Sequence, residues 1–197
     1  MATRGFEGRP RVDSSRLPPG QHLVDDFPVM TAGGNEVIDR ADWKLTVSDG
    51  IATKSYNWAS LLDLGTEKIT VDIHCVTHWS KLDTVWEGVP LSTVFDDAGV
   101  GDYDHATITS YGGYTTNLPL ADLTDHDAMV AMSFDDQPLE AEHGGPVRLL
   151  VPHLYMWKSA KWLREIQLTD EDDPGFWEVS GYHNYGDPWR EQRYFQD

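Results

Sequence analysis

Apolar and polar residues alternate in several short stretches of the chain, and this pattern predicts β-strands. Trp43, Leu45 and Val47 would share one face of a strand over residues 43–47. Over residues 68–75 every second side chain is apolar, which places Cys75 on the buried face at the C-terminal end of a strand. Further strands are predicted at residues 105–111, 128–134, 146–151 and 162–168.

The helical signals are few and short. Residues 88–99 are predicted to form a helix, with Pro90 in its first turn, an apolar stripe that includes Leu91 and Phe95, and Gly99 at its end. A single helical turn is expected at residues 119–123, and a turn at 155–161. Strands therefore dominate, and the predicted class is α+β with mixed sheets and short scattered helices.

The chain divides by pattern into an N-terminal segment and one domain. Prolines and glycines interrupt residues 1–35, so we expect an irregular segment that packs on the body through apolar residues such as Phe27 and Met30. Residues 36–197 are predicted to be a single domain, because 197 residues are too few for two ordinary ones. From Phe176 onward the domain ends in an irregular, aromatic-rich C-terminal arm.

The formal net charge of −18 excludes nucleic acid and anionic membrane surfaces as favourable partners. The 33 acidic residues are spread along the chain, which favours a halophilic protein over an ordinary acidic bacterial one. No apolar run is long enough to cross a bilayer, and no secretory signal is visible, so a cytoplasmic location is expected. The single cysteine excludes an intramolecular disulfide and a Cys-rich iron–sulfur or zinc site.

Most local motifs have a weak chemical meaning when taken alone. His74 and His78 are four residues apart, but His74 is on a predicted strand and the pattern is not that of a zinc protease. A stronger signal is the group Arg148, Lys158 and Lys161 beside Ser159, in a chain with only 15 basic residues. This group is either an anion pocket or a set of salt-bridge partners for the surplus acids, and the residues alone leave both readings open.

Four sequence blocks together resemble the sulfite oxidase superfamily, which includes the catalytic subunits of methionine-sulfoxide reductases. They are IHCVTHWS at residues 73–80 with WEGVPL at 86–91, then GYTTNLPL at 113–120, HGGPVRLLVP at 143–152 and KSAKWL at 158–163. Each block resembles a family segment, and the order is the family's. The resemblance covers roughly residues 40–170, and the chain is similar to a short, single-domain member.

The resemblance implies a sulfite-oxidase-type fold, a molybdopterin cofactor and a molybdenum ion. It implies that Cys75 is both the thiolate ligand of the metal and a catalytic residue, since soft sulfur ligands suit this metal. The implied cofactor-binding residues are Tyr114, Thr115, Asn117, His143, Arg148, Lys158, Ser159 and Lys161. The aromatic residues of the C-terminal arm and His183 would cap the entrance to the metal, or the arm would simply pack on the core.

One departure from the family pattern concerns the substrate. Sulfite oxidases usually carry an arginine five residues after the cysteine, where this chain has Ser80. The resemblance therefore implies a monomeric oxidoreductase that transfers an oxygen atom to or from a small molecule, with reduction of a sulfoxide or N-oxide favoured. The alternatives are sulfite oxidation with an atypical anion site and a non-catalytic molybdopterin carrier. Since no second redox motif is visible, electrons would come from a separate flavin or haem partner.

Overall fold

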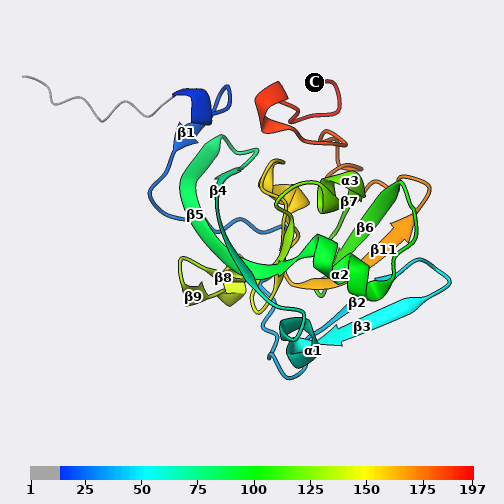
Figure 1. Cartoon of the computed structure of the whole chain (residues 1–197). Coiled ribbons are helices and arrows are strands. Elements are labelled where there is room, and N and C mark those ends of the chain that lie inside the picture. Colours follow the sequence, from blue (N-terminus) through cyan, green and yellow to red (C-terminus); the bar gives the residue numbers. More distant parts are fainter. Residues whose placement is uncertain (1–13) are drawn as a thin grey trace, which may run out of the picture.

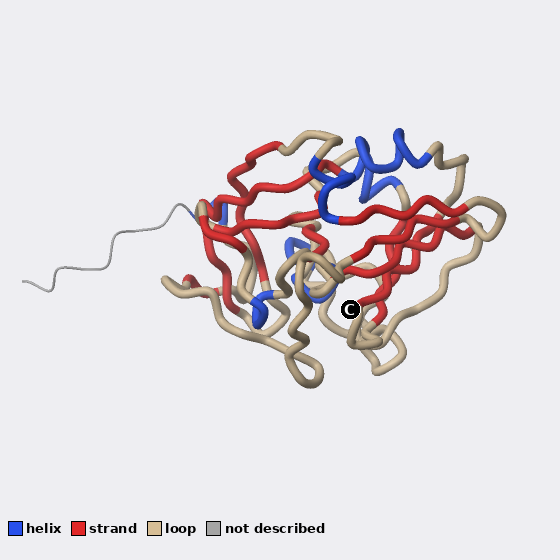
Figure 2. Tube along the Cα trace, turned by 90° about the horizontal axis from the view of Figure 1, so that it is seen from below, coloured by secondary structure: helices blue, strands red, loops and turns tan. Residues whose placement is uncertain are grey.

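Two mixed β-sheets form the framework of the protein in the computed structural model, which describes residues 14–197 (Figure 1). Predictions that concern residues 1–13 lie outside the described residues. Figure 2 shows that the strands are the main regular elements and that the helices between them are short. This arrangement confirms the α+β class predicted from the sequence.

The first sheet has six strands within the described residues. They are β1 (His22–Leu23), β4 (Glu67–His74), β5 (Trp79–Pro90), β8 (Met129–Phe134), β9 (Gln137–Pro138) and β10 (Arg148–Leu150). The long strand β5 pairs with β4 and β8 in antiparallel register and with β1 in parallel register. Because β4 and β5 form a hairpin, the residues between them, 75–78, lie at one end of this sheet.

The second sheet has the strand order β3-β2-β11-β6-β7. Its strands are β2 (Lys44–Ser48), β3 (Thr53–Asn57), β6 (His105–Ser110), β7 (Thr115–Pro119) and β11 (Leu163–Thr169). Only the β11–β2 pair is parallel. The turn between β6 and β7 contains Gly113, whose φ of +80° is a conformation that glycine adopts without strain.

The helices are all short. The α-helices are α1 (Trp58–Leu62), α2 (Leu91–Ala98) and α3 (Ala121–Thr124), and the 3₁₀-helices are η1 (Ser14–Arg16), η2 (Ala141–His143), η3 (Met156–Lys158) and η4 (Pro188–Arg190). Gly99 ends α2 in the left-handed conformation. Within the described residues, no helix has the length and apolar character that crossing a membrane requires.

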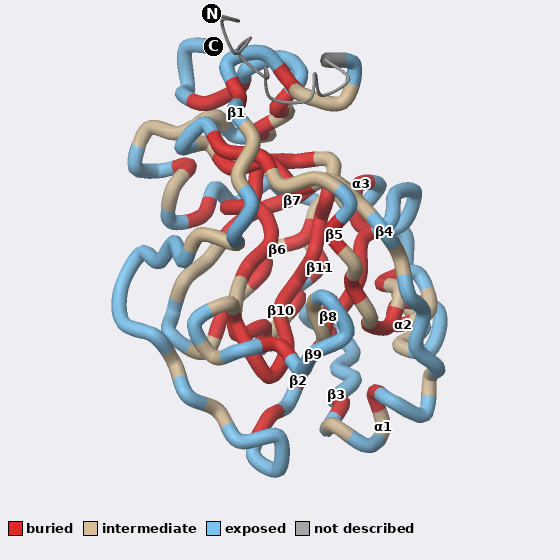
Figure 3. Tube along the Cα trace, turned by 90° about the vertical axis from the view of Figure 1, so that its left-hand side faces the viewer, coloured by how far each residue is buried: buried red, intermediate tan, exposed pale blue. Residues whose placement is uncertain are grey.

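Strand β8 separates two apolar clusters. Val130 and Met132 face the larger cluster, which the second sheet and α2 share, whereas Met129 and Ala131 face a smaller cluster that contains Cys75. The period-2 alternation of a strand explains why both faces of β8 are apolar in this central position. Figure 3 shows the buried strands at the centre and the exposed loops around them.

The predicted helix at residues 88–99 is wrong at its start. Residues 88–90 are the last residues of β5, and the helix begins at Leu91. At Gly88 a Cβ atom would lie 2.3 Å from the carbonyl oxygen of Val130, so glycine permits β5 and β8 to approach closely. The glycine therefore marks a strand contact and not the beginning of a helix.

Strands β3, β5 and β7 were not predicted, since polar residues occupy buried positions in two of them. In β5, Thr84 is buried, and its hydroxyl donates to the carbonyl oxygen of Val71 and accepts from Trp86 Nε1. In β7, Thr116 and Asn117 are buried and hydrogen bonded to other segments. Satisfied polar groups can replace apolar ones in a core, and they hide the alternation from a pattern search.

The N-terminal and C-terminal segments lie side by side at the end of β4 and β5 (Figure 1). Residues 14–35 contain η1 and β1, and Phe27 packs its ring against Trp79, Trp86 and His143. From the C-terminal arm, residues 176–197, Arg193 donates to the carbonyl oxygen of Pro19. Within the described residues, the segment containing Phe27 thus contacts the body, whereas the division of the chain at residue 35 stays a prediction.

Candidate functional site

A cavity of about 370 Å³ opens beside the small apolar cluster. Its wall comes from six segments that are distant in the sequence: residues 27–36, 75–79, 110–114, 143–148, 156–162 and 176–182. Six of the sequence-predicted site residues line it, namely Cys75, Tyr114, His143, Arg148, Ser159 and Lys161. The tertiary structure therefore brings the predicted thiol and most of the predicted cations together.

Cys75 lies at the first position after β4, in the tight turn that leads into β5. Its backbone N–H donates to the carbonyl oxygen of Trp79 at 2.9 Å, and the turn closes with His78 in a left-handed conformation at φ +73°. The residue is 6% exposed and the hydroxyl of Thr77 lies 3.1 Å from its Sγ. Burial raises the pKa of the Cys75 thiol despite this hydrogen bond, so a bound cation would be needed to hold it as a thiolate.

Two side chains from the ends of the chain hold the turn that carries Cys75. Gln21 Nε2 donates to the carbonyl oxygens of Cys75 and Trp79, at 3.0 and 2.9 Å. Arg193 donates to the carbonyl oxygen of Val76 and to Gln21 Oε1, both at 3.2 Å. Because Gln21 and Arg193 are buried, these hydrogen bonds fix the turn from outside the cavity.

We expect Arg193→Gln to loosen this turn. A hydrogen bond from a charged donor contributes about 1.5–3 kcal/mol, so losing those from Arg193 should speed amide hydrogen exchange at Cys75 and His78 by at least about tenfold. The matched control is Arg190→Gln, which changes an exposed arginine of the same arm. Equal exchange rates in the two variants would show that Arg193 does not hold the turn.

The cationic part of the wall has no carboxylate partner. Arg148 is 2% exposed and donates to the carbonyl oxygens of His143 and Ser159, at 2.9 and 2.6 Å. Within residues 14–197 neither Arg148 nor Lys161 forms an ion pair with an acid, although the protein has 33 acids. Burial lowers the pKa of Arg148 to about 9 and that of Lys161 to about 8. Arg148 is buried and Lys161 is half-buried, and cations without carboxylate counter-ions fit a site for an anion.

Further polar groups in the wall are left without partners inside the described fold. Trp79 Nε1 and Ser110 Oγ are buried, line the cavity and have no hydrogen-bond partner among residues 14–197. The ring of His143 is stacked on Phe27 with 4.1 Å between centroids, and burial lowers its pKa, which favours the neutral imidazole. A polar, anionic ligand in the cavity would satisfy these groups.

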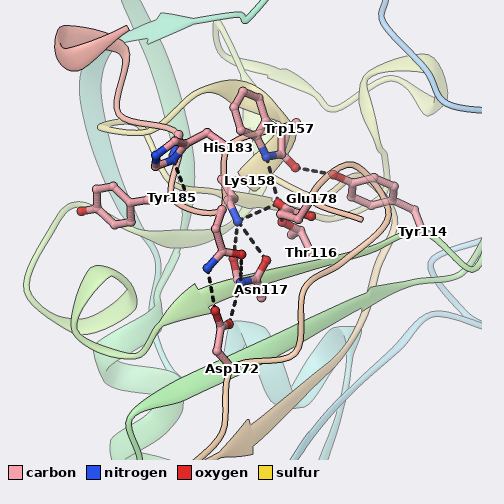
Figure 4. A network of polar contacts seen from close by, with 11 residues as sticks. Tyr114, Thr116, Asn117, Trp157, Lys158, Asp172, Glu178, His183 and Tyr185 are labelled. Atoms are coloured by element: carbon pink, nitrogen blue, oxygen red, sulfur yellow. Dashed lines mark hydrogen bonds and ion pairs between the residues drawn. The ribbon is translucent and has the colours of Figure 1, made fainter. Parts of the chain in front are cut away.

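Three predicted cofactor residues lie outside the cavity wall: Thr115, Asn117 and Lys158. Lys158 Nζ forms an ion pair with Glu178 at 2.6 Å, with both side chains 1% exposed, and it donates to the carbonyl oxygen of Asn117. Figure 4 shows these contacts, and shows Asn117 linked in turn to Asp172. The amino group of Lys158 is thus used to hold the C-terminal arm.

Thr115 and Asn117 belong to β7, which is hydrogen bonded to the C-terminal arm. Thr115 accepts a hydrogen bond through its carbonyl oxygen from the N–H of Phe176, and Thr116 donates to Glu178. Tyr114, at the start of this region, does line the cavity, and its hydroxyl donates to the carbonyl oxygen of Trp157 at 2.7 Å.

The arm closes one side of the cavity with aromatic rings. Trp177 and Tyr182 line the wall, and their ring centroids are 5.0 Å apart. His183, which the sequence placed with them, is not part of the wall, and its Nδ1 accepts from the backbone N–H groups of Tyr185 and Gly186. His183 therefore shapes the chain of the arm.

Sequence reasoning missed several residues of the wall. They include Trp79, Ser110, Gly112 and Trp157. The pair Gly112–Gly113 lies between β6 and β7 and lines the cavity. A glycine pair beside a strand end was the one available signal, because it permits a ligand to approach the backbone.

Ser80 does not face the cavity. It is fully buried, and its hydroxyl lies 2.8 Å from Nδ1 of His74 and 3.2 Å from Nε2 of Gln21. Burial lowers the pKa of His74 to about 4, so this imidazole is neutral at ordinary pH. In this arrangement Ser80 supports the turn of Cys75.

Comparison with known proteins shows one family match. A family model described as the oxidoreductase molybdopterin binding domain matches residues 32–177. The chain is 42% identical to the uncharacterized oxidoreductase YuiH of Bacillus subtilis, over 93% of this chain and 94% of that protein.

A more distant relative has a named activity. It is the protein-methionine-sulfoxide reductase catalytic subunit MsrP of Gluconobacter oxydans, which is 27% identical over 58% of this chain and 42% of that protein. Among solved structures, the sulfane dehydrogenase SoxCD of Paracoccus pantotrophus matches with a TM-score of 0.63 and 17% identity, over 87% of this chain and 57% of that chain. At this identity the likeness shows a shared, sulfite-oxidase-type fold.

Proposed function

Because the chain belongs to the oxidoreductase molybdopterin binding domain family, we propose that it reduces a small sulfoxide or N-oxide at a molybdenum ion bound by Cys75. The protein is an oxidoreductase of the sulfite oxidase superfamily, and its cofactor is molybdopterin-bound molybdenum. The substrate, the direction of the reaction and the ligation by Cys75 are our proposal.

The single observation that carries the proposal is that one cavity contains both a buried thiol and cations without counter-ions. Cys75 lines it together with Arg148 and Lys161. These residues fit the group, since a molybdopterin has a phosphate for the cations and a pterin with donors and acceptors for polar atoms such as Trp79 Nε1 and Ser110 Oγ.

The protein's own residues would bind, orient and shield the cofactor. When bound, the cofactor supplies two-electron oxygen-atom transfer. Arg148 and Lys161 would hold the phosphate, His143 would lie against the pterin, and Tyr114 and Ser159 would complete the wall. Trp177 and Tyr182 would exclude water on the side of the arm. Reduction of a sulfoxide consumes two electrons and two protons and releases the sulfide and water.

The lining of the cavity supports a neutral S-oxide or N-oxide over sulfite. The wall around Cys75 includes Met156, Trp157, Trp177 and Tyr182, which are apolar or aromatic. Such surfaces favour a neutral, partly apolar substrate over a small dianion. Position 80 does not face the cavity, because Ser80 is buried and its hydroxyl contacts His74. This position therefore offers no anion-binding side chain to the cavity.

The electron donor is part of the same proposal. The sequence has one cysteine and no haem-attachment motif, so we propose that a separate flavin or haem protein reduces the metal. The cytoplasmic location, the monomeric state and the halophilic character expected from the sequence are also proposals.

A substrate panel tests the proposed reaction. With a reduced viologen as donor, the cofactor-loaded protein should reduce methionine sulfoxide, dimethyl sulfoxide or trimethylamine N-oxide. Its kcat/KM for the best of these should exceed that for sulfite oxidation with a ferricyanide acceptor by at least about tenfold, the factor that about 1.4 kcal/mol of discrimination gives. Efficient sulfite oxidation without reductase activity would reverse the proposal in favour of an atypical sulfite oxidase.

A further inference from the structure

Three potential metal ligands meet outside the wall of the cofactor cavity. They are Asp122 in α3, His126 just after it, and His153 in the loop that follows β10. His153 Nε2 lies 2.9 Å and His126 Nε2 3.9 Å from Asp122 Oδ1, and the two imidazole centroids are 4.1 Å apart. One ligand atom from each residue lies within 4.8 Å of the others.

We propose that Asp122, His126 and His153 form a second metal site, for a divalent transition metal ion such as Zn²⁺. Imidazole nitrogens with one carboxylate suit zinc and its neighbours, whereas Mg²⁺ and Ca²⁺ prefer oxygen ligands alone. Bonds of about 2.0–2.1 Å in a tetrahedron place ligand atoms roughly 3.3 Å apart, so small side-chain rotations would complete the site. Water would take the fourth position.

The burial of the three side chains suits a metal site that exchanges with solvent. The side chain of Asp122 is 8% exposed and that of His153 is 25% exposed, while His126 is 51% exposed. Asp122 and His153 are thus the two more buried ligands. His126 is the solvent-exposed ligand, and its side chain would rotate to bind an ion that enters from solvent. In the described residues His153 Nδ1 is buried without a hydrogen-bond partner, so hydrogen bonding alone does not satisfy this ring.

A tyrosine from the C-terminal arm supports the carboxylate. The hydroxyl of Tyr185 donates to Asp122 Oδ1 at 2.8 Å. Outer contacts of this kind orient metal ligands.

The site would join three parts of the fold. Asp122 belongs to α3 and His153 to the loop before η3, and Tyr185 belongs to the arm whose Trp177 and Tyr182 line the cofactor cavity. A bound ion would strengthen the attachment of the arm to the body. Metal binding at this site would be independent of the proposed substrate and of the ligation by Cys75.

A titration of the full, molybdopterin-loaded protein with Zn²⁺ tests the proposal. After removal of loosely bound metal with a chelator, calorimetry should show one Zn²⁺ bound per chain. Co²⁺ in place of Zn²⁺ should give the visible absorption of a tetrahedral site. His126→Ala and His153→Ala should each weaken binding at least about tenfold. His22→Ala, an exposed histidine on β1, should leave it unchanged.

His126 is half exposed, so His126→Ala should fold even if His153→Ala does not. Molybdenum content and circular dichroism check that each variant retains its fold. Wild-type affinity in folded His126→Ala would overturn the proposal, as would an absence of stoichiometric binding to the wild type. In that case the three residues form a hydrogen-bond network only.

Discussion

Replacing Cys75 with serine should abolish turnover while leaving the protein folded. The change exchanges a soft sulfur for a hard, poorly ionised oxygen of similar size. The variant should lose the visible absorption from sulfur-to-molybdenum charge transfer and the wild-type shape of the Mo(V) paramagnetic resonance signal. It should retain molybdopterin to the extent that Arg148 and Lys161 hold the phosphate. Absorption, resonance and activity measurements on one preparation check all of these results.

A control separates loss of a metal ligand from the effect of a new hydroxyl in the core. Ala131→Ser places a hydroxyl in the same small apolar cluster, at a residue that does not line the cavity. That change should cost about 1–3 kcal/mol of unfolding free energy and leave spectrum and turnover unchanged. If Cys75→Ser behaves in the same way as Ala131→Ser, Cys75 is a core residue and does not bind the metal.

Replacing Lys161 with glutamine should strip most of the cofactor from the purified protein. Lys161 is half-buried in the cavity wall, and its amino group donates to the carbonyl oxygen of Glu142 without an acidic partner, so its charge has a bound anion as its natural counterpart. Loss of such a contact costs about 2–4 kcal/mol, roughly a thirty- to thousand-fold loss in affinity. Arg148→Gln should have a similar effect, with an added loss of stability because Arg148 also binds backbone carbonyls. Molybdenum and pterin contents measure the result.

Lys158 provides the matched contrast, because it is a buried lysine of the same sequence block outside the cavity wall. Lys158→Met alone should destabilise the protein by about 3–5 kcal/mol, since it leaves Glu178 as a buried, unpaired charge. The double variant Lys158→Met/Glu178→Leu removes both charges and should fold with near-normal cofactor content. A full cofactor content in Lys161→Gln would show that Lys161 does not bind the cofactor. Selective loss of cofactor in the folded double variant would show that Lys158 does bind it.

The sequence alone determined the fold class of the protein, its family and its cofactor. Alternation of apolar residues predicted β2, β4, β6, β8 and β11 within a residue or two of their ends, because each of these strands has an apolar face in the core. The four blocks identified the family and the molybdopterin cofactor, which the match over residues 32–177 confirms. Short motifs carry this information because a metal and a phosphate require particular atoms, whatever fold presents them.

Other features depended on contacts between residues far apart in the sequence. The length of β5 was hidden because Thr84 and Gly88 occupy buried positions that only their neighbours on β4 and β8 make favourable. Likewise, nothing in the spacing of Lys158 and Lys161 indicates that one faces Glu178 and the other the cavity.

The segments that pack beside a buried charge decide its partners, and the local sequence does not show which segments these are. Gln21 and Arg193, 172 residues apart, meet over the turn of Cys75 in the same way. The sequence thus determined which chemical groups the protein has, and the tertiary structure decided which of them face the cavity, because burial leaves each charged group only the partners that the fold brings to it.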